Sequence, residues 1–174
     1  APGILMFLFP AFTMRSFAEE KKSGTLELLI PQPISIFKII LSKYLAASFL
    51  AVLTILPTLI YYISVHQMGE IVGNIDHPST IGGYLGLLLL SITYVAIGVL
   101  ASSLSKNQVI GFLLGLFLNF LIYVGFTYLA VLAGDPIDYY LMKLSMLDHF
   151  NSLQRGIIDS RDIIYFFSLI QIHL

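Results

Sequence analysis

The residues able to do chemistry in this chain are few and scattered. The four histidines, His66, His77, His149 and His173, have neither the H-x-x-x-H spacing nor the His/Glu helix pair typical of metal ligands, and no cysteine supplies a thiolate. Only His149 has a carboxylate beside it in sequence, that of Asp148. No nucleophile, base and orienting residue form a set, and no G-x-x-x-x-G-K-S/T motif is present to hold nucleotide phosphates. The sequence therefore predicts no catalytic residue and no metal site.

Three long apolar segments separate these groups, and none contains an Asp, Glu, Lys, Arg or His. They are residues 44–65, 82–104 and 110–133. At 1.5 Å per residue, each is long enough to cross a hydrocarbon layer about 30 Å thick. A hydrophobic share of 57% and a charged share of 11% also lie outside the range of soluble domains. We therefore predict an all-α membrane protein with three complete spans and a lipid bilayer as its main partner.

The ends of the chain are apolar but too short to cross a bilayer alone. We expect residues 1–14 to be the end of one span and 161–174 to be the start of the last, so that 1–174 is a fragment of a single transmembrane domain. Residues 15–43 and 134–160 then lie on opposite sides of the membrane. In the second of these, Asp135-Pro136 favours the start of an interfacial helix, which Gly156 can end before Ser160 caps the last span.

Lysine and arginine indicate the orientation, because cytoplasmic flanks of spans are enriched in both. Most of the nine fall on one side of the predicted spans, namely Arg15, Lys21, Lys22, Lys38, Lys43 and Lys106. The 66–81 loop has none, and the 134–162 segment has three. Residues 15–43 are therefore predicted to be cytoplasmic. The net charge of −1 offers no basic face to nucleic acid, which we exclude as a partner.

Polar and small residues within the spans are the remaining candidates for function. Asn119, with Tyr123 near it, could form a hydrogen bond across helices or contact a substrate in a pathway. Two G-x-x-x-G pairs allow close helix packing, within one subunit or at a dimer seam: Gly82 with Gly86, and Gly111 with Gly115. Pro57 could kink its span.

Residues 15–43, between the first partial span and the first complete one, have the clearest succession of helix-capping and helix-ending residues. Its first helix should continue out of the membrane through Met14, Phe17 and Ala18, which form one apolar stripe. Gly24 is suited to end that helix, and Thr25 to cap a short helix at residues 26–30.

Prolines then prevent that second helix from continuing. Pro31 and Pro33 stop it, and Ser35 can cap a third helix that runs through Lys38 and Lys43 into the membrane. The segment is therefore expected to be a stiff bracket, and its leucines form an apolar surface suited to a partner.

This segment resembles the ABC-2 type exporter permeases in the run Arg15-Ser-Phe-Ala-Glu-Glu-Lys-Lys-Ser-Gly-Thr-Leu-Glu-Leu-Leu-Ile-Pro-Gln-Pro-Ile-Ser35. The resemblance implies that the run contains the coupling helix that meets a separate ABC ATPase subunit. The residues that it assigns to this contact are Glu19, Glu20, Gly24, Thr25, Glu27, Leu28, Leu29 and Pro31. ATP and Mg²⁺ would then be bound by the partner, and this chain would hold no cofactor.

Three further stretches resemble the gliding-motility-associated ABC permease, F subunit: residues 57–62, 73–76 with 101–104, and 155–166. The resemblance implies a six-span permease in a bacterial inner membrane, working as a homodimer or heterodimer in ATP-driven export or in gliding machinery. Two other classes stay open. One is a membrane scaffold that binds its partner without transport, and the other is an ion-coupled carrier, which the uncharged spans disfavour.

Overall fold

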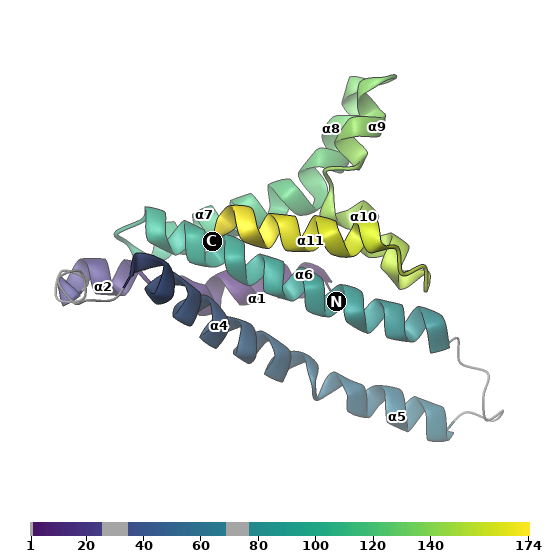
Figure 1. Ribbon diagram of the computed structural model, residues 1–174, viewed down its shortest axis with the longest axis horizontal. Coiled ribbons are helices and arrows are strands. Elements are labelled where there is room, and N and C mark those ends of the chain that lie inside the picture. Colours follow the sequence, from purple (N-terminus) through teal and green to yellow (C-terminus); the bar gives the residue numbers. More distant parts are fainter. Residues whose placement is uncertain (1, 26–34, 69–76) are drawn as a thin grey trace.

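The computed structural model describes residues 2–25, 35–68 and 77–174, and every regular element in these ranges is helical (Figure 1). The protein is an all-α membrane protein. Its elements are α1 Pro2–Thr13, α2 Ala18–Ser23, α4 Ile36–Ile55, α5 Thr58–Met68, α6 His77–Leu104, α7 Gln108–Phe120, the π-helical segment η1 Leu121–Gly125, α8 Phe126–Ala133, α9 Ile137–Met142, α10 Met146–Gln154 and α11 Ser160–His173.

Three stretches of the described residues are long and apolar enough to cross a membrane: Ile36–Ser64, His77–Leu104 and Gln108–Ala133. Each begins two to eight residues before the apolar segment seen in the sequence, because the helix already starts among the flanking polar residues. The first of them is interrupted, since α4 ends at Ile55 and α5 begins at Thr58. Pro57 lies in this break, where it cannot donate a backbone N–H to the preceding turn.

The second span, α6, is the centre of the fold. The most apolar window of α6 is 72% buried, against 28% and 22% for the other two spans. Helices α1, α4, α7, α10 and α11 all pack against it. Consequently every residue from Thr93 to Val99 is buried, whereas α4 and α7 each leave one apolar face exposed.

Small residues allow α1 and α7 to approach α6 closely. A Cβ atom added to Gly98 of α6 would lie 2.1 Å from the Thr13 hydroxyl oxygen on α1. A Cβ atom on Gly115 of α7 would lie 3.4 Å from side-chain carbons of both Ala101 and Pro10. Such close backbone contact maximises dispersion attraction where lipid provides no hydrophobic driving force.

Both predicted G-x-x-x-G pairs make contacts within this chain. Gly115 contacts α6 and α1 as just described. Gly111 lies one turn earlier, and a Cβ placed on it would lie 2.7 Å from the Ser105 hydroxyl oxygen. Gly82 and Gly86 face α10, where they contact Leu153 and, for Gly86, the ring of Phe150.

The third span contains a π-helical turn at Leu121–Gly125. A π turn leaves a backbone carbonyl without its usual helical partner. Here the Ser145 hydroxyl donates a 2.9 Å hydrogen bond to the carbonyl oxygen of Tyr123 and lies 2.7 Å from the Thr127 hydroxyl. The ring of Tyr123 packs edge-on against Tyr94 of α6, with centroids 6.0 Å apart. The wide turn is thus held from both sides.

The interfacial helix expected after Pro136 is two helices, so the prediction of a single one was wrong. Helix α9 ends at Met142, and α10 begins again at Met146 because the Ser145 side chain accepts the Leu147 N–H. Gly156 has a φ of +78° just past the end of α10, as expected of a terminating glycine. The cap of α11 is Asp159 and not Ser160, since the Asp159 carboxylate accepts the Arg161 N–H at 3.0 Å.

The carboxylate nearest to His149 is that of Asp162, and not that of its sequence neighbour Asp148. His149 Nδ1 lies 2.6 Å from Asp162 Oδ1, and Nε2 lies 2.9 Å from the carbonyl oxygen of Lys143. The imidazole stacks on the Tyr165 ring at 3.9 Å. Both ring nitrogens face acceptors, so both can donate at once only when the ring is protonated. This contact ties α10 to α11.

A pair of adjacent glycines on α6 tests how tightly α10 packs. A Cβ on Gly82 would lie 2.1 Å from the carbonyl oxygen of Leu153, a backbone atom that cannot rotate away, whereas a Cβ on Gly83 meets nothing within 4 Å. We expect Gly82→Ala to lower the free energy of unfolding by about 1–3 kcal/mol through overpacking. Gly83→Ala should leave it unchanged or raise it by up to about 1 kcal/mol through helix propensity. Thermal unfolding in detergent measures both, and equal midpoints for the two variants would contradict the packing described.

Candidate functional site

The segment that leaves the membrane after α1 bends sharply, and residues 14–25 are called the elbow below. Helix α1 ends at Thr13, residues 14–17 form turns, and α2 begins at Ala18. The prediction of one continuous helix through Met14, Phe17 and Ala18 was therefore wrong. Gly24 ends α2 with a φ of +73°, which confirms the predicted terminator.

The bend exists because α6 provides a hydrogen-bond partner that the sequence pattern does not reveal. The buried hydroxyl oxygen of Ser102 accepts the backbone N–H groups of Phe17 at 3.0 Å and Ala18 at 3.2 Å. The same hydroxyl donates to the carbonyl oxygen of Met14 at 3.1 Å. One serine therefore satisfies three backbone groups of the turn, which would otherwise be buried without partners.

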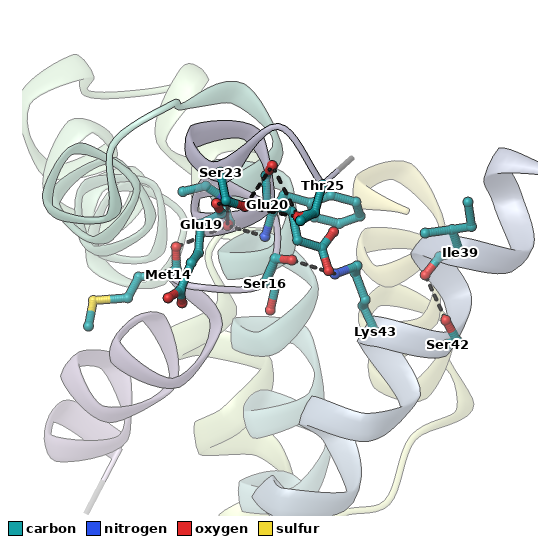
Figure 2. A network of polar contacts seen from close by, with 12 residues as sticks. Met14, Ser16, Glu19, Glu20, Ser23, Thr25, Ile39, Ser42 and Lys43 are labelled. Carbon is teal, nitrogen blue, oxygen red and sulfur yellow. Dashed lines mark hydrogen bonds and ion pairs between the residues drawn. The ribbon is translucent and has the colours of Figure 1, made fainter. Parts of the chain in front are cut away.

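Lys43 attaches the elbow to the first complete span. Its ammonium group donates to the Glu20 carboxylate at 2.6 Å and to the Ser16 carbonyl oxygen at 2.5 Å, as Figure 2 shows. The same group lies 4.7 Å from the centre of the Phe17 ring, which adds a cation–π attraction. Three residues of the elbow thus contact one side chain from α4.

A second lysine fixes α2 to the end of α6. The Lys21 ammonium donates to the carbonyl oxygen of Ser103, one residue before the last of that helix. A cation at this position is favoured, because unpaired carbonyls make the C-terminal end of a helix partially negative. The elbow is therefore attached to both α4 and α6 (Figure 1).

The residues assigned to partner contact have different surroundings. Glu19 is exposed, while Glu20 is half-buried and paired with Lys43 through Oε1. Its Oε2 is buried with no hydrogen-bond partner among the described residues. Thr25 is exposed, and its hydroxyl lies 2.9 Å from that of Ser23 (Figure 2). Of the predicted set, Glu20 and Gly24 thus have structural roles within the elbow, Glu20 through its pair with Lys43 and Gly24 as the end of α2.

Other predictions for this segment fall outside the described residues or differ from them. Glu27, Leu28, Leu29 and Pro31 lie outside the described ranges, as does the expected helix at 26–30. Ser35 does precede α4, but its side chain makes no capping hydrogen bond. The Ser35 backbone carbonyl accepts the N–H groups of Lys38 at 2.9 Å and Ile39 at 3.4 Å, as in the first turn of a helix.

Asn119 is buried where α7 meets α6 and α1. Gly115, one turn earlier on α7, contacts both of those helices, and Tyr123, one turn later, contacts Tyr94. Neither the nitrogen nor the oxygen of the Asn119 amide has a hydrogen-bond partner in the part of the chain that is described. The expected bond across helices is therefore not formed. Such an unpaired buried amide costs about 1–3 kcal/mol per polar group.

The residues around α9 hold a further charged contact. Just past the end of α9, the Lys143 ammonium lies 4.4 Å from the Tyr139 ring centre, and its hydrogen bond and charge lower the pKa of that exposed phenol. Over the described ranges, no three His, Asp or Glu side chains converge in a way that could hold a metal ion. The elbow, by contrast, makes polar contacts with two spans, through Ser102 and Ser103 of α6 and Lys43 of α4.

The comparison with protein families agrees with this arrangement. A family model described as ABC-2 family transporter protein matches residues 2–159. The chain belongs to the ABC-2 transporter family. No curated protein matches the chain. As a permease domain, it is a multi-pass membrane component of an ABC transporter and is not itself catalytic, and its family implies an ABC ATPase as partner.

Sequence reasoning missed the permease residues that hold the elbow in place. Lys43 and Lys21 were used only for orientation, and Ser102 only as part of the resemblance at residues 101–104. One sequence signal could have indicated them. Ser102 and Ser103 are adjacent near the end of an apolar span, where their hydroxyls can bond backbone groups of a neighbouring loop. Their partners lie more than 80 residues away in sequence, so the pairing itself is a property of the fold.

Adjacent serines also provide a matched test of the elbow. Ser102→Ala removes the partner of two buried N–H groups and should lower the permease's free energy of unfolding by about 1–3 kcal/mol. It should also speed tryptic cleavage after Lys22, because the elbow opens locally more often. Ser103→Ala should change little, since its hydroxyl bonds only Leu100 of its own helix and its backbone carbonyl still accepts from Lys21. Equal cleavage rates in the two variants would argue against the Ser102 contact.

Proposed function

We propose that this chain is the membrane half of an ATP-driven exporter and that the elbow receives movement from a separate ATPase subunit. The observation that carries this proposal is the Ser102 hydroxyl, which bonds the elbow at three points to the end of the central helix. A displacement of α2 would therefore move α6 directly, with no flexible linker between them. The family match supports a permease role in such a complex.

The proposed chemistry is divided between two proteins. ATP and Mg²⁺ bind in the partner, whose closure pushes on the elbow. Glu19, Gly24, Thr25, Glu27, Leu28, Leu29 and Pro31 form the docking surface, while Glu20 acts through its pair with Lys43. Motion of α2 then reaches α6 through Ser102 and α4 through Lys43, so two spans shift together. The chain belongs, on this proposal, to the cytoplasmic membrane of a bacterium with the elbow in the cytosol, because lysine and arginine concentrate on that side.

Docking and force transmission can be tested with separate variants of the full-length permease and its cognate ATPase. Replacing Glu27 and Leu28 together by Ala should abolish co-purification of the ATPase, because the apolar and acidic contacts are lost. Leu104→Ala is the matched control, since this leucine is 65% exposed at the end of α6 but lies outside the elbow. Undiminished ATPase association in the Glu27 and Leu28 variant would count against the docking surface.

The transmission of movement from the ATPase through the elbow to the spans is measured with the ATPase still bound. Residues 1–174 contain no cysteine, so Leu132→Cys at the exposed end of α8 is their only thiol, and any cysteine elsewhere in the full-length permease is replaced by serine. In lipid vesicles we expect ATP to change the labelling rate of that thiol by a soluble maleimide. Adding Ser102→Ala should reduce this change while ATPase association persists, whereas adding Ser103→Ala should not. An ATP response that is identical in all backgrounds would remove Ser102 from the coupling route.

We also propose Asn119, with Tyr123 beside it, as a polar contact in the transport pathway. The support is its unpaired buried amide at the seam of α1, α6 and α7, which substrate or an altered state could satisfy. Asn119→Leu should raise thermal stability, since it replaces the unpaired amide with an apolar group of similar size. It should also weaken ATP-driven movement of cargo. Higher stability with unchanged ATPase stimulation and transport would show that Asn119 is a packing residue.

Three finer assignments accompany the proposal. The permease acts as a dimer, with an identical or related second permease, as the resemblance to ABC-2 type exporter permeases implies. Assignment to the gliding-motility F subunit rests on the stretches at 57–62, 73–76, 101–104 and 155–166. Gliding of cells that lack the gene tests it, since normal gliding would exclude that role.

A scaffold without transport would bind the ATPase but show no ATP-dependent labelling change, and a carrier driven by ions would need no ATP.

A further inference from the structure

Residues 143–145 join α9 to α10 and are called the linker below. Each of them is bound by a side chain or backbone group from another part of the fold. The Lys143 carbonyl oxygen lies 2.9 Å from His149 Nε2 on α10. The next carbonyl oxygen, that of Leu144, accepts the Tyr165 hydroxyl of α11, and the serine that follows bonds η1 as described above. The path of the linker is therefore set by contacts at three consecutive residues.

The linker lies between two parts of the molecule that have different surroundings. Before it, α8 and α9 pack on each other and extend away from the bundle (Figure 1). After it, α10 is packed on α6, where Gly82 and Gly86 contact Leu153. Together with η1, the linker connects the α8–α9 pair to the bundle, so its contacts influence how that pair is held.

His149 and Asp162 form a largely buried pair beside the linker. The side chain of His149 is 14% exposed and that of Asp162 is 8% exposed. The distance of 2.6 Å between Nδ1 and Oδ1 is short, as in a charge-assisted hydrogen bond. The other carboxylate oxygen, Oδ2, is buried and has no hydrogen-bond partner in the described part of the chain. A buried carboxylate is costly unless a positive charge pairs with it, and the imidazole is the group in contact with it.

Most other groups around this pair keep their charge near neutral pH. The charged and titratable side chains that face or flank the pair are Tyr165 and Arg161 on α11, Lys143 at the end of α9, Asp148 on α10 and Tyr123 on η1. Helix α6, which also packs on α10, meets it through glycines. Imidazole titrates between about pH 5 and 8, whereas phenols, ammonium groups and backbone carbonyls do not. Of the groups that bind the linker, His149 is thus the one suited to change its charge in that range.

The number of protons on the His149 ring decides whether the Lys143 carbonyl is bound. A protonated imidazole donates to the Asp162 carboxylate and to that carbonyl together. A neutral imidazole has one N–H, which stays at Nδ1 because a charged carboxylate is the stronger acceptor. Nε2 then directs a lone pair at the carbonyl oxygen, and the contact with the linker becomes repulsive.

We propose that His149 is a pH-sensitive latch on the linker. In acid the imidazolium holds the Lys143 carbonyl, and the α8–α9 pair is fixed relative to α10 and α11. As the pH rises and the ring loses its second proton, the carbonyl is released and the α8–α9 pair gains freedom of movement. On the orientation proposed above, the latch responds to the pH outside the cell. The latch itself does not depend on coupling to an ATPase.

Nuclear magnetic resonance of the full-length permease with ¹⁵N-labelled histidine reports the state of the ring directly. The His149 signals are those that disappear in His149→Gln. We expect two protonated ring nitrogens at about pH 5 and the Nδ1–H tautomer at about pH 8. A ring that keeps the same protonation at both pH values, or that carries its remaining proton on Nε2 at the higher one, would overturn the proposal.

Release of the linker is measured with two spin labels, whose distance signal does not itself depend on pH. Tyr140→Cys on α9 and Ile164→Cys on α11 place labels at exposed positions of residues 1–174, and any cysteine elsewhere in the full-length permease is replaced by serine. Between about pH 5 and 8 the distribution of distances should broaden or shift. Adding His149→Gln should abolish this pH response.

The matched control is His173→Gln, because His173 Nδ1 lies 2.6 Å from the Leu169 carbonyl oxygen within its own helix. This variant should keep the full pH response. A distance distribution that is the same at both pH values, or one that responds equally with and without His149, would contradict the latch. The comparison at two pH values needs no substitution of His149, so it decides the proposal independently of how well that variant folds.

Discussion

Close contact between α6 and its neighbours is the constraint on which the rest of this structure depends. In a bilayer, apolar side chains gain little from leaving lipid, so helices associate where their backbones can approach. Gly98, Gly111 and Gly115 provide that approach, and Thr13 and Pro10 of α1 fill the space they leave. Because α6 is enclosed in this way, anything attached to its ends moves with it.

The polar contacts of the elbow follow from that packing. Ser102 can serve three backbone groups only because α1 is held against α6 closely enough for the chain to turn over its end. Lys43 then joins the turn to α4, and Lys21 joins it to the last carbonyls of α6. The elbow is thus joined to two spans through side-chain contacts, and this is the connection on which the proposed coupling to an ATPase relies.

Local features were predictable from the sequence, and features made by distant partners were not. The three apolar segments and the terminators Gly24 and Gly156 depend on length, hydropathy and backbone freedom, which a sequence states directly. The Ser102 contact and the His149–Asp162 pair each depend on a group from another helix. The spacing of apolar residues favoured a continuous helix through Phe17. That spacing carries no information about the Ser102 hydroxyl, which bonds the turn from another helix.

The wide turn in the third span has a geometric consequence for everything that follows it. Gly111, Gly115 and Asn119 are four residues apart, so in a regular helix their line would drift by about 40° at each step. The extra residue within Leu121–Gly125 corrects this drift and returns Tyr123 to face Tyr94. The position of a π turn can shift along a helix. A shift of one turn would rotate α8 about its own axis, while α7 kept its packing against α6 and α1. The π turn is therefore the point in the third span at which α8 could change its rotation without disturbing the packing of α7.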